Sequence, residues 1–189
     1  MASTSKLSDV AKNYLCRFYE ILDEMIEGIS EAELTDSLSH NFIVQMIPHH
    51  CAAIKMSDNI LQYTTFIPLQ NIAQHIIVSQ TKSIENMQAI LPCCSQCLNS
   101  VQDICLYKKG FRTITQTMYS AMQSACADNN INADFMREMI PHHKGAIQMS
   151  KNALQYPICP ELEPILRAII TSQESGVREM EWLLRCACR

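Results

Sequence analysis

The sequence predicts an all-α protein of about six helices, arranged as two copies of one three-helix unit. The first observation is an internal repeat. Shifting the 189-residue chain by 93 positions aligns residues 42–63 with residues 135–156, and 14 of these 22 positions are identical. The second is composition: the chain has only four glycines, whereas the tight turns of antiparallel sheets depend on glycine. Self-similarity at a long period is typical of a duplicated supersecondary unit.

Each copy is expected to contain three helices, because the repeat extends beyond its best-matched segment in both directions. Upstream, Tyr14 and Phe18 match Tyr107 and Phe111 at a spacing of four, which places each pair on one helix face. The helices are predicted at about residues 8–29, 38–63, 68–91, 101–125, 132–156 and 159–185. The copies span residues 1–96 and 97–189, and the two can pack as one body about a pseudo-two-fold axis.

Pro48 and Pro141 lie inside the middle helix of each copy. A proline removes one backbone hydrogen bond and kinks a helix, or else it occupies the first position of a helix that restarts there. The sequence alone does not distinguish a kinked helix from a helix that restarts at the proline.

Both middle helices carry Met-Ile-Pro-His-His within an apolar stripe. At 100° per residue, His49 and His142 fall on the stripe, whereas His50 and His143 fall on its shoulder. A buried imidazole needs a hydrogen-bond partner or a metal ion, since burying it unpaired is costly. Because adjacent side chains point about 100° apart, we expect one histidine of each pair to bind directly. The other would support it or lie at the surface.

Methionines accompany the histidines at helical spacing in both copies. Thioether sulfur favours Cu(I) or Ag(I), and imidazole accepts copper, zinc, nickel or iron. We therefore expect a site for a soft or borderline transition-metal ion such as copper. Its candidate ligands are Met46, His49, His50, Met56, Met87, Met139, His142, His143, Met149 and Met180. Gln80 and Gln173, on the third helix of each copy, are candidates for supporting those ligands through hydrogen bonds. The alternative is a structural or interaction protein, in which the methionines are core residues and the histidines are only hydrogen-bonded.

Several functional classes are disfavoured. The net charge of −4 gives no reason to expect nucleic acid or an anionic membrane as partner. No Glu-x-x-His, His-Glu-x-x-His or glycine-rich phosphate loop occurs, which argues against a di-iron carboxylate site, a zinc protease and a nucleotide site. We expect no nucleotide or organic cofactor and no catalytic constellation, so the protein is not expected to be an enzyme.

The N-terminus shows no basic segment followed by an apolar one, and no run of eighteen apolar residues exists. These features predict a cytoplasmic protein without a signal peptide or membrane span. The ten cysteines are then expected to be reduced thiols.

Two groups of cysteines follow the third helix of each copy. Cys93, Cys94 and Cys97 end the first copy, and Cys186 and Cys188 end the second. If the two ends met in the fold, these thiols could form a thiolate site for zinc or Cu(I). The simpler interpretation is a set of surface or half-buried thiols. Five other cysteines are read as isolated thiols or small core residues: Cys16, Cys51, Cys105, Cys126 and Cys159. His40 and His75 have no counterpart in the other copy and are read as solvent-facing or capping.

The motif Phe-x-x-x-Met-x-x-His-His-x-x-Ala-x-x-Met, followed by Gln and Met on the next helix, resembles the domain-of-unknown-function family 305. It occurs twice, beginning at Phe42 and at Phe135. The resemblance implies a ferritin-like four-helix bundle, with copper or silver binding through methionine and histidine in some members. Family members usually carry a glutamate where this chain has Ser83 and Gly176, which puts a carboxylate ligand in doubt.

The function expected from these observations is storage, buffering or sensing of a transition-metal ion by a helical bundle. The expected partner is the metal ion, and a homo-oligomer is compatible with the sequence.

Overall fold

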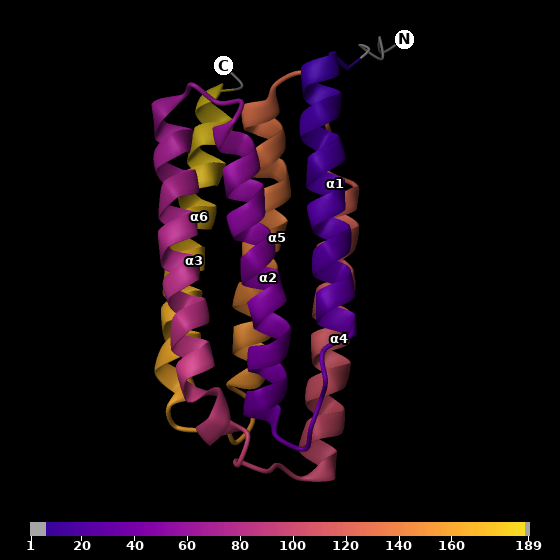
Figure 1. The fold of residues 1–189 in the computed structure, drawn as a ribbon, viewed down its shortest axis with the longest axis vertical. Helices are drawn as coiled ribbons and strands as arrows, with labels where there is room; N and C mark the ends of the chain where they lie inside the picture. Colours follow the sequence, from indigo (N-terminus) through magenta and orange to yellow (C-terminus); the bar gives the residue numbers. More distant parts are fainter. Residues whose placement is uncertain (1–6, 188–189) are drawn as a thin grey trace.

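The computed structural model describes residues 7–187, which form six helices and no strand. Every predicted helix is present, and every predicted boundary lies within three residues of the observed one. Figure 1 shows the helices lying along one common long axis. They are α1 (Asp9–Ser30), α2 (Leu38–Leu61), α3 (Ile67–Cys94), α4 (Val101–Gln123), α5 (Ile131–Ala153) and α6 (Leu162–Ala187).

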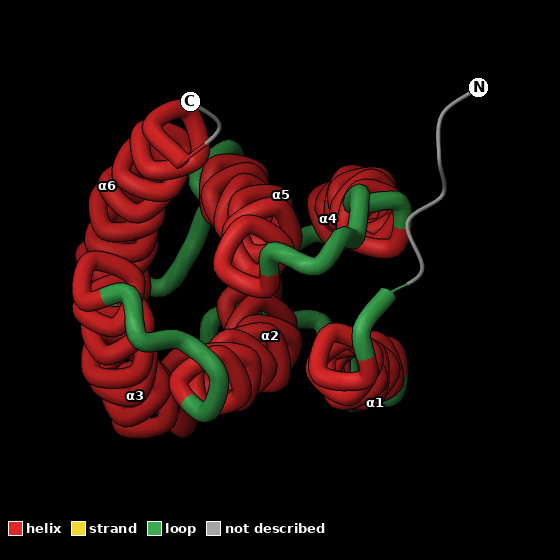
Figure 2. The backbone as a smooth tube through the Cα atoms, turned by 90° about the horizontal axis from the view of Figure 1, so that it is seen from above, coloured by secondary structure: helices red, strands yellow, loops and turns green. Residues whose placement is uncertain are grey.

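The helices form three layers of two, which Figure 2 shows from one end. α1 and α4 make one outer layer, α2 and α5 the middle layer, and α3 and α6 the other outer layer. Each layer thus contains the same helix from both repeats. Because the middle layer is covered on both sides, 15 of the 24 residues of α2 and 15 of the 23 residues of α5 are buried. The duplicated histidine motif therefore lies at the centre of the molecule.

The outer helices bury one face each, as expected for amphipathic helices at a surface. In α3, only seven of 28 residues are buried. α3 and α6 run in opposite directions, so the end of α3 lies beside the start of α6 (Figure 1). No helix within residues 7–187 is both long and apolar enough to cross a membrane.

The motif helices continue through their prolines. Pro48 lies inside α2 and Pro141 inside α5, so neither helix restarts at its proline. Gly28 of α1 lets the first proline approach closely, since a Cβ on this glycine would lie 2.9 Å from the Pro48 Cβ. The N-caps are Ser37 and Asn130, whose side chains accept hydrogen bonds from the first turn.

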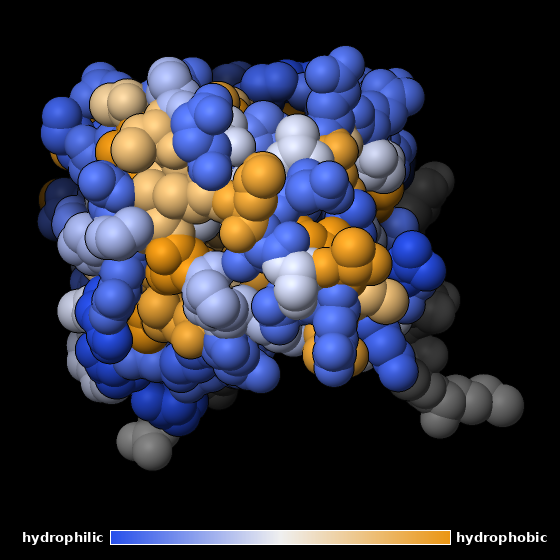
Figure 3. Space-filling model, turned by 90° about the horizontal axis from the view of Figure 1, so that it is seen from below, coloured by the Kyte–Doolittle hydropathy of each residue, from blue (hydrophilic) through white to orange (hydrophobic). Residues whose placement is uncertain are grey.

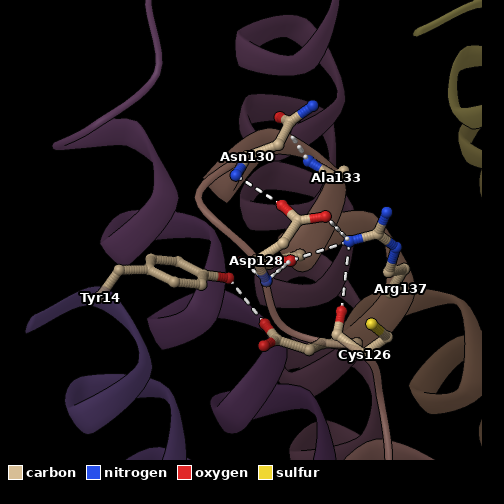
Figure 4. Close-up of polar contacts among 8 residues, drawn as sticks. Tyr14, Cys126, Asp128, Asn130, Ala133 and Arg137 are labelled. Atoms are coloured by element: carbon tan, nitrogen blue, oxygen red, sulfur yellow. Dashed lines mark hydrogen bonds and ion pairs between the residues drawn. The ribbon is translucent and has the colours of Figure 1, made fainter. Parts of the chain in front are cut away.

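A buried polar network joins the two repeats on the α1–α4 side of the middle layer (Figure 4). The Tyr14 hydroxyl of α1 donates to Glu138 of α5 at 2.7 Å. One turn earlier in α5, Asp134 accepts from the Asp128 backbone N–H at 3.1 Å and from Arg137 at 3.0 Å. Repeat one has the neutral Asn41 and Gln45 in place of Asp134 and Glu138.

Burial determines the ionisation of these carboxyl groups. It raises the pKa of Glu138 to about 8, opposed by the Tyr14 hydrogen bond and assisted by the charge of Asp134. It raises the pKa of Asp134 to about 6. Glu138 is therefore mainly protonated at neutral pH, because a buried carboxylate is costly unless it is fully compensated.

Candidate metal centre

The two inner histidines of the motif meet at the interface of α2 and α5. The rings of His49 and His142 stack with centroids 3.7 Å apart and an angle of 31° between their planes. The His142 Nε2 N–H donates to the backbone carbonyl of His49 at 3.2 Å. Neither side chain has exposed surface. The stripe positions predicted from helical spacing therefore face each other across the pseudo-two-fold axis.

The two outer histidines are also buried, which corrects the expectation that one of each pair could lie at the surface. His50 is 1% exposed and His143 is 3% exposed. Each outer ring lies about 6 Å from its inner neighbour, with centroid distances of 5.9 and 6.0 Å. They point from the middle layer toward α3 and α6, because each lines a pocket formed by these outer helices.

The outer histidines differ in their partners. His50 Nε2 shares a hydrogen bond of 3.1 Å with the Ser83 hydroxyl. At the matching position of the other repeat, Gly176 has no side chain, and a Cβ there would lie 3.0 Å from His143 Cδ2 and 3.1 Å from its Nε2. Gly176 thus leaves room for the imidazole but offers it no side-chain partner.

Burial keeps all four imidazoles neutral. It lowers the pKa of His50 to about 3 and that of His142 to about 4. Burial, with repulsion from the neighbouring histidines, also lowers the pKa of His49 and His143 well below the usual range. A neutral imidazole presents a free lone pair to a metal ion without first losing a proton.

Several buried imidazole nitrogens have no hydrogen-bond partner within the described residues. They are both ring nitrogens of His49 and the Nδ1 atoms of His50, His142 and His143. An unpaired buried polar atom costs about 1–3 kcal/mol, and such groups in a folded protein call for an explanation. A bound metal ion would satisfy imidazole lone pairs, so this donor set fits a transition metal.

Two matching pockets lead from the groove between α3 and α6 to the outer histidines. One pocket, of about 400 Å³, reaches His50, and the other, of about 610 Å³, reaches His143. Both are lined by Gln80 and Gln173, which lie at equivalent positions in the repeats. Both amide atoms of Gln80 and the Oε1 of Gln173 are buried without a partner. The glutamines predicted to support the site therefore lie between the two pockets.

The methionines predicted as ligands are all buried and all belong to the hydrophobic core. They are Met46, Met56, Met87, Met139, Met149 and Met180. Core packing accounts for this burial without a metal ion. Their positions are thus compatible with both interpretations of the methionine stripe.

The structure does not bring together the two groups of cysteines that end the repeats. Cys186 lines a pocket with Phe66 and Pro68, beside the start of α3, whereas Cys93 lies at the end of that 28-residue helix. At 1.5 Å per residue, the ends of α3 are about 40 Å apart. Cys188 lies outside the described residues.

The first group meets Cys159 instead. The sulfur atoms of Cys93 and Cys159 and a carboxylate oxygen of Glu161 lie within 4.8 Å of one another. Among residues 7–187, these form the only group of three His, Cys, Asp or Glu ligand atoms gathered so closely. Of the two sequence interpretations of Cys159, the structure agrees with a small core residue, because its side chain is fully buried in the core, and not with an isolated thiol. The repeat could not predict this contact, because the positions equivalent to Cys159 and Glu161 in the first copy are Phe66 and Pro68.

The two unmatched histidines lie apart from the motif histidines. His40 is half-buried, and its ring nitrogens contact the Ser95 hydroxyl at 2.9 Å and the Glu33 carbonyl at 3.1 Å. It thus links the first turn of α2 to the end of α3. His75 is exposed on α3, at the edge of the His143 pocket.

Comparison with known proteins identifies a family that this chain matches. A sequence model described as a domain of unknown function (DUF305) matches residues 21–91 and 107–184, one segment in each repeat. A crystal structure of a DUF305 fragment from Deinococcus radiodurans is similar, with 23% identity and a TM-score of 0.57. CopM in its Cu(II)-bound form is 25% identical, with a TM-score of 0.58. Each similarity covers 78% of this chain and 95% of the other. No curated protein matches the chain.

Proposed function

The chain belongs to the DUF305 family, and from this premise we propose that it binds a copper-like transition-metal ion at the buried histidines of α2 and α5. Storage or buffering of the ion is the role we infer. The family is one of unknown function, so the proposal depends on the site itself.

The observation that carries the proposal is the set of buried, neutral and unpaired imidazole nitrogens. Packing alone would favour apolar side chains in the middle layer, since unpaired polar atoms there reduce stability. Five ring nitrogens of the four motif histidines are buried without a partner. Metal coordination would satisfy lone pairs that no described side chain satisfies.

The outer histidines supply the route by which an ion would reach the site. His50 and His143 line the inner parts of the two pockets that open between α3 and α6. These residues would take the ion first, and His49 and His142 lie directly behind them. Met46 and Met139, one helical turn earlier in each motif, would add thioether sulfur for a soft ion.

The Cu(II)-bound CopM structure supports copper as the ion. It is 25% identical to this chain, and the similarity covers 78% of this chain and 95% of CopM, with a TM-score of 0.58.

A binding protein fits the pocket linings better than an enzyme. The His50 pocket has no carboxylate among its described lining residues, and the His143 pocket has Glu179 alone. A metal-dependent hydrolase or oxidase would need a base or an open coordination position beside the ion. The polar side chains that line both pockets are mainly hydroxyl and amide groups instead.

One observation favours the alternative of a structural protein. His49 and His142 stack face to face, and no three ligand atoms of the motif histidines gather within 4.8 Å within the described part of the chain. In this alternative, the imidazoles serve only as flat packing units between α2 and α5. Metal uptake therefore has to be measured directly.

The test is titration of tag-free protein with Cu(I) under anaerobic conditions, in competition with a chromophoric Cu(I) chelator. A C93S/C94A/C97S/C159A variant, which lacks the thiols at the end of α3 and the start of α6, is used so that thiolate binding there does not contribute. The proposal predicts uptake of at least one equivalent per chain, and His40→Ala serves as the control because His40 lies apart from the motif histidines and lines neither pocket. Uptake below about a tenth of an equivalent would establish the structural alternative.

A further inference from the structure

We propose that Cys93, Cys159 and Glu161, with Cys94 and Cys97 beside them, form a second metal site for a divalent d¹⁰ ion such as Zn(II). This site would fasten the end of α3 to the start of α6. It is separate from the histidine cluster, and it depends on neither the copper proposal nor the family.

The first argument is the meeting of ligand atoms from two distant segments. The sulfur atoms of Cys93 and Cys159 and an oxygen of Glu161 lie within 4.8 Å of one another. The Cys159 thiol donates to the Glu161 carboxylate at 2.8 Å. Cys94 directly follows Cys93 at the end of α3, and the Cys97 backbone N–H donates to the carbonyl of Cys94 at 3.2 Å. Four thiols and one carboxylate thus share one corner of the bundle.

The second argument is that the backbone around these thiols is already fixed. The hydroxyl of Ser37 donates to the carbonyl of Cys94 at 2.8 Å, and the backbone N–H of Cys159 donates to the Ser39 hydroxyl at 2.8 Å. Both serines have no exposed surface and lie at the start of α2. Hydrogen bonds of this kind hold metal ligands in place and are typical of metal sites.

Polar contacts also hold the adjoining loops. The Asn99 side chain accepts from the backbone N–H of Leu38 at 2.8 Å and donates to the carbonyl of Pro157 at 2.6 Å. Its neighbours Leu98 and Val101 are 76% and 86% exposed. Figure 3 shows this end of the molecule, with hydrophobic residues gathered over part of it among hydrophilic ones. A metal ion bound to Cys93 and to Cys159 and Glu161 would add coordinate bonds between the end of α3 and the start of α6.

The donor set selects the class of ion. Zinc accepts thiolate sulfur at about 2.3 Å and carboxylate oxygen at about 2.0–2.2 Å in tetrahedral sites. Copper(I) has little affinity for a carboxylate. On binding, each cysteine ligand releases its thiol proton to solvent, and the ion takes the place of the proton between Cys159 and Glu161. Cys93 and Glu161 are exposed, so an ion can reach them.

The opposite end of the bundle shows that the fold does not require these residues. By the repeat, Cys159 and Glu161 correspond to Phe66 and Pro68, which lie beside Cys186 and line an apolar pocket with Trp182. The same helix junction is therefore built there from hydrophobic groups. Cys93 has a counterpart in Cys186, whereas Cys159 and Glu161 are an addition to the common architecture.

The experiment is titration of the reduced, tag-free, full-length protein with Co(II), followed by displacement with Zn(II). Tetrahedral Co(II)–thiolate coordination gives sulfur-to-metal charge-transfer absorption, which imidazole ligands do not give. The proposal predicts this absorption at one equivalent and its loss when Zn(II) is added. The absence of charge-transfer absorption would overturn it.

The decisive variant is Cys93→Ser with Glu161→Gln, because both side chains are exposed and their replacement leaves the core intact. We expect Zn(II) affinity to fall by about 100-fold or more, since loss of even supporting groups costs 10–100-fold. Two controls should keep the absorption: C16S/C105S, which removes exposed thiols elsewhere, and H50A/H143A, which removes the proposed copper ligands. Equal loss in either control would contradict the assignment.

Discussion

The two motif pairs occupy equivalent places in the repeats, yet they have different surroundings. His50 shares a hydrogen bond with Ser83, whereas His143 faces Gly176 and a larger pocket. On the other side of the middle layer, repeat one has neutral Gln45 where repeat two has Glu138, bonded to Tyr14. The duplication has kept the inner histidines and varied the groups around them.

Comparing the two repeats separates the features that both share from the features that only one part of the molecule has. The stacked inner histidines, the buried methionines and the pocket glutamines occur in both repeats. The partner of the outer histidine and the buried carboxyl groups occur in one repeat only, whereas the cysteine cluster joins Cys93 of repeat one to Cys159 and Glu161 of repeat two. We therefore expect each repeat to have its own metal affinity and its own pH response.

The largest effect is expected when both outer histidines are removed. The H50A/H143A variant should bind Cu(I) about 1,000-fold more weakly than the wild type, because loss of direct ligands exceeds the 10–100-fold cost of losing supporting groups. Competition against a chromophoric chelator measures this affinity. Circular dichroism checks that the variant remains helical, and an unchanged affinity would place the copper site elsewhere.

Exchange of the outer partners should make the two repeats alike. Ser83→Gly frees His50 Nε2 from its hydroxyl, and we expect the affinity of that repeat to change about tenfold toward that of the other. The reciprocal Gly176→Ser places a Cβ 3.0 Å from His143, so it should crowd the ring and weaken binding. Each exchange is measured in a background with the other outer histidine replaced. Equal affinities of the two repeats before the exchange would show that these partners have no role.

The buried Glu138 should make stability depend on pH. Its pKa is raised from 4.5 to about 8 in the folded state, so between these values the unfolded state ionises while the folded state stays protonated. Stability then falls as pH rises and levels off above the folded pKa. Between pH 7 and 8.5, the wild type should lose about 1 kcal/mol more than Glu138→Gln does, at about 1.4 kcal/mol per unit.

Urea denaturation at several pH values measures this difference. The chosen window lies above the pKa of Asp134, which is raised to about 6, and the contributions that the wild type and the variant share cancel in the comparison. Glutamine is the matched replacement because repeat one has Gln45 at the equivalent position. Parallel pH profiles for the wild type and the variant would show that Glu138 ionises freely.

The smallest difference concerns the N-caps of the motif helices. Ser37 accepts from the His40 N–H and also donates to the Cys94 carbonyl, whereas Asn130 accepts from the Ala133 N–H. Loss of a cap costs about 1 kcal/mol, and Ser37→Ala also leaves a buried carbonyl without that donor. We expect Ser37→Ala to lower the free energy of unfolding by up to about 1 kcal/mol more than Asn130→Ala. Equal losses in thermal denaturation would mean that the Cys94 contact contributes nothing.

The helices and their order could be predicted because the repeat and the apolar periodicity act locally. Spacing alone placed His49 and His142 on the inner face of their helices, where the structure has them stacked. Spacing placed His50 and His143 at the edge of the apolar stripe. It could not show that α3 and α6 cover this edge and bury both rings.

Contacts that depend on the direction of packing could not be predicted. Cys159 meets Cys93 because α3 and α6 are antiparallel, so the end of one helix lies beside the start of the other. The repeat suggested the opposite pairing, of Cys93 with Cys186, since it aligns helix ends and carries no information on their relative direction. Tyr14 and Glu138 are likewise 124 residues apart in sequence, and neither belongs to the motif.

The central claim is that the buried motif histidines bind a transition-metal ion, and X-ray absorption at the copper edge tests it most directly. Tag-free C93S/C94A/C97S/C159A protein is loaded with one equivalent of Cu(I), so that the thiols at the end of α3 and the start of α6 do not compete. The account predicts the outer-shell scattering of imidazole rings, with thioether sulfur from the motif methionines, and loss of the imidazole scattering in the H50A/H143A variant. A spectrum of sulfur scatterers without imidazole, or one unchanged by the histidine replacements, would contradict it.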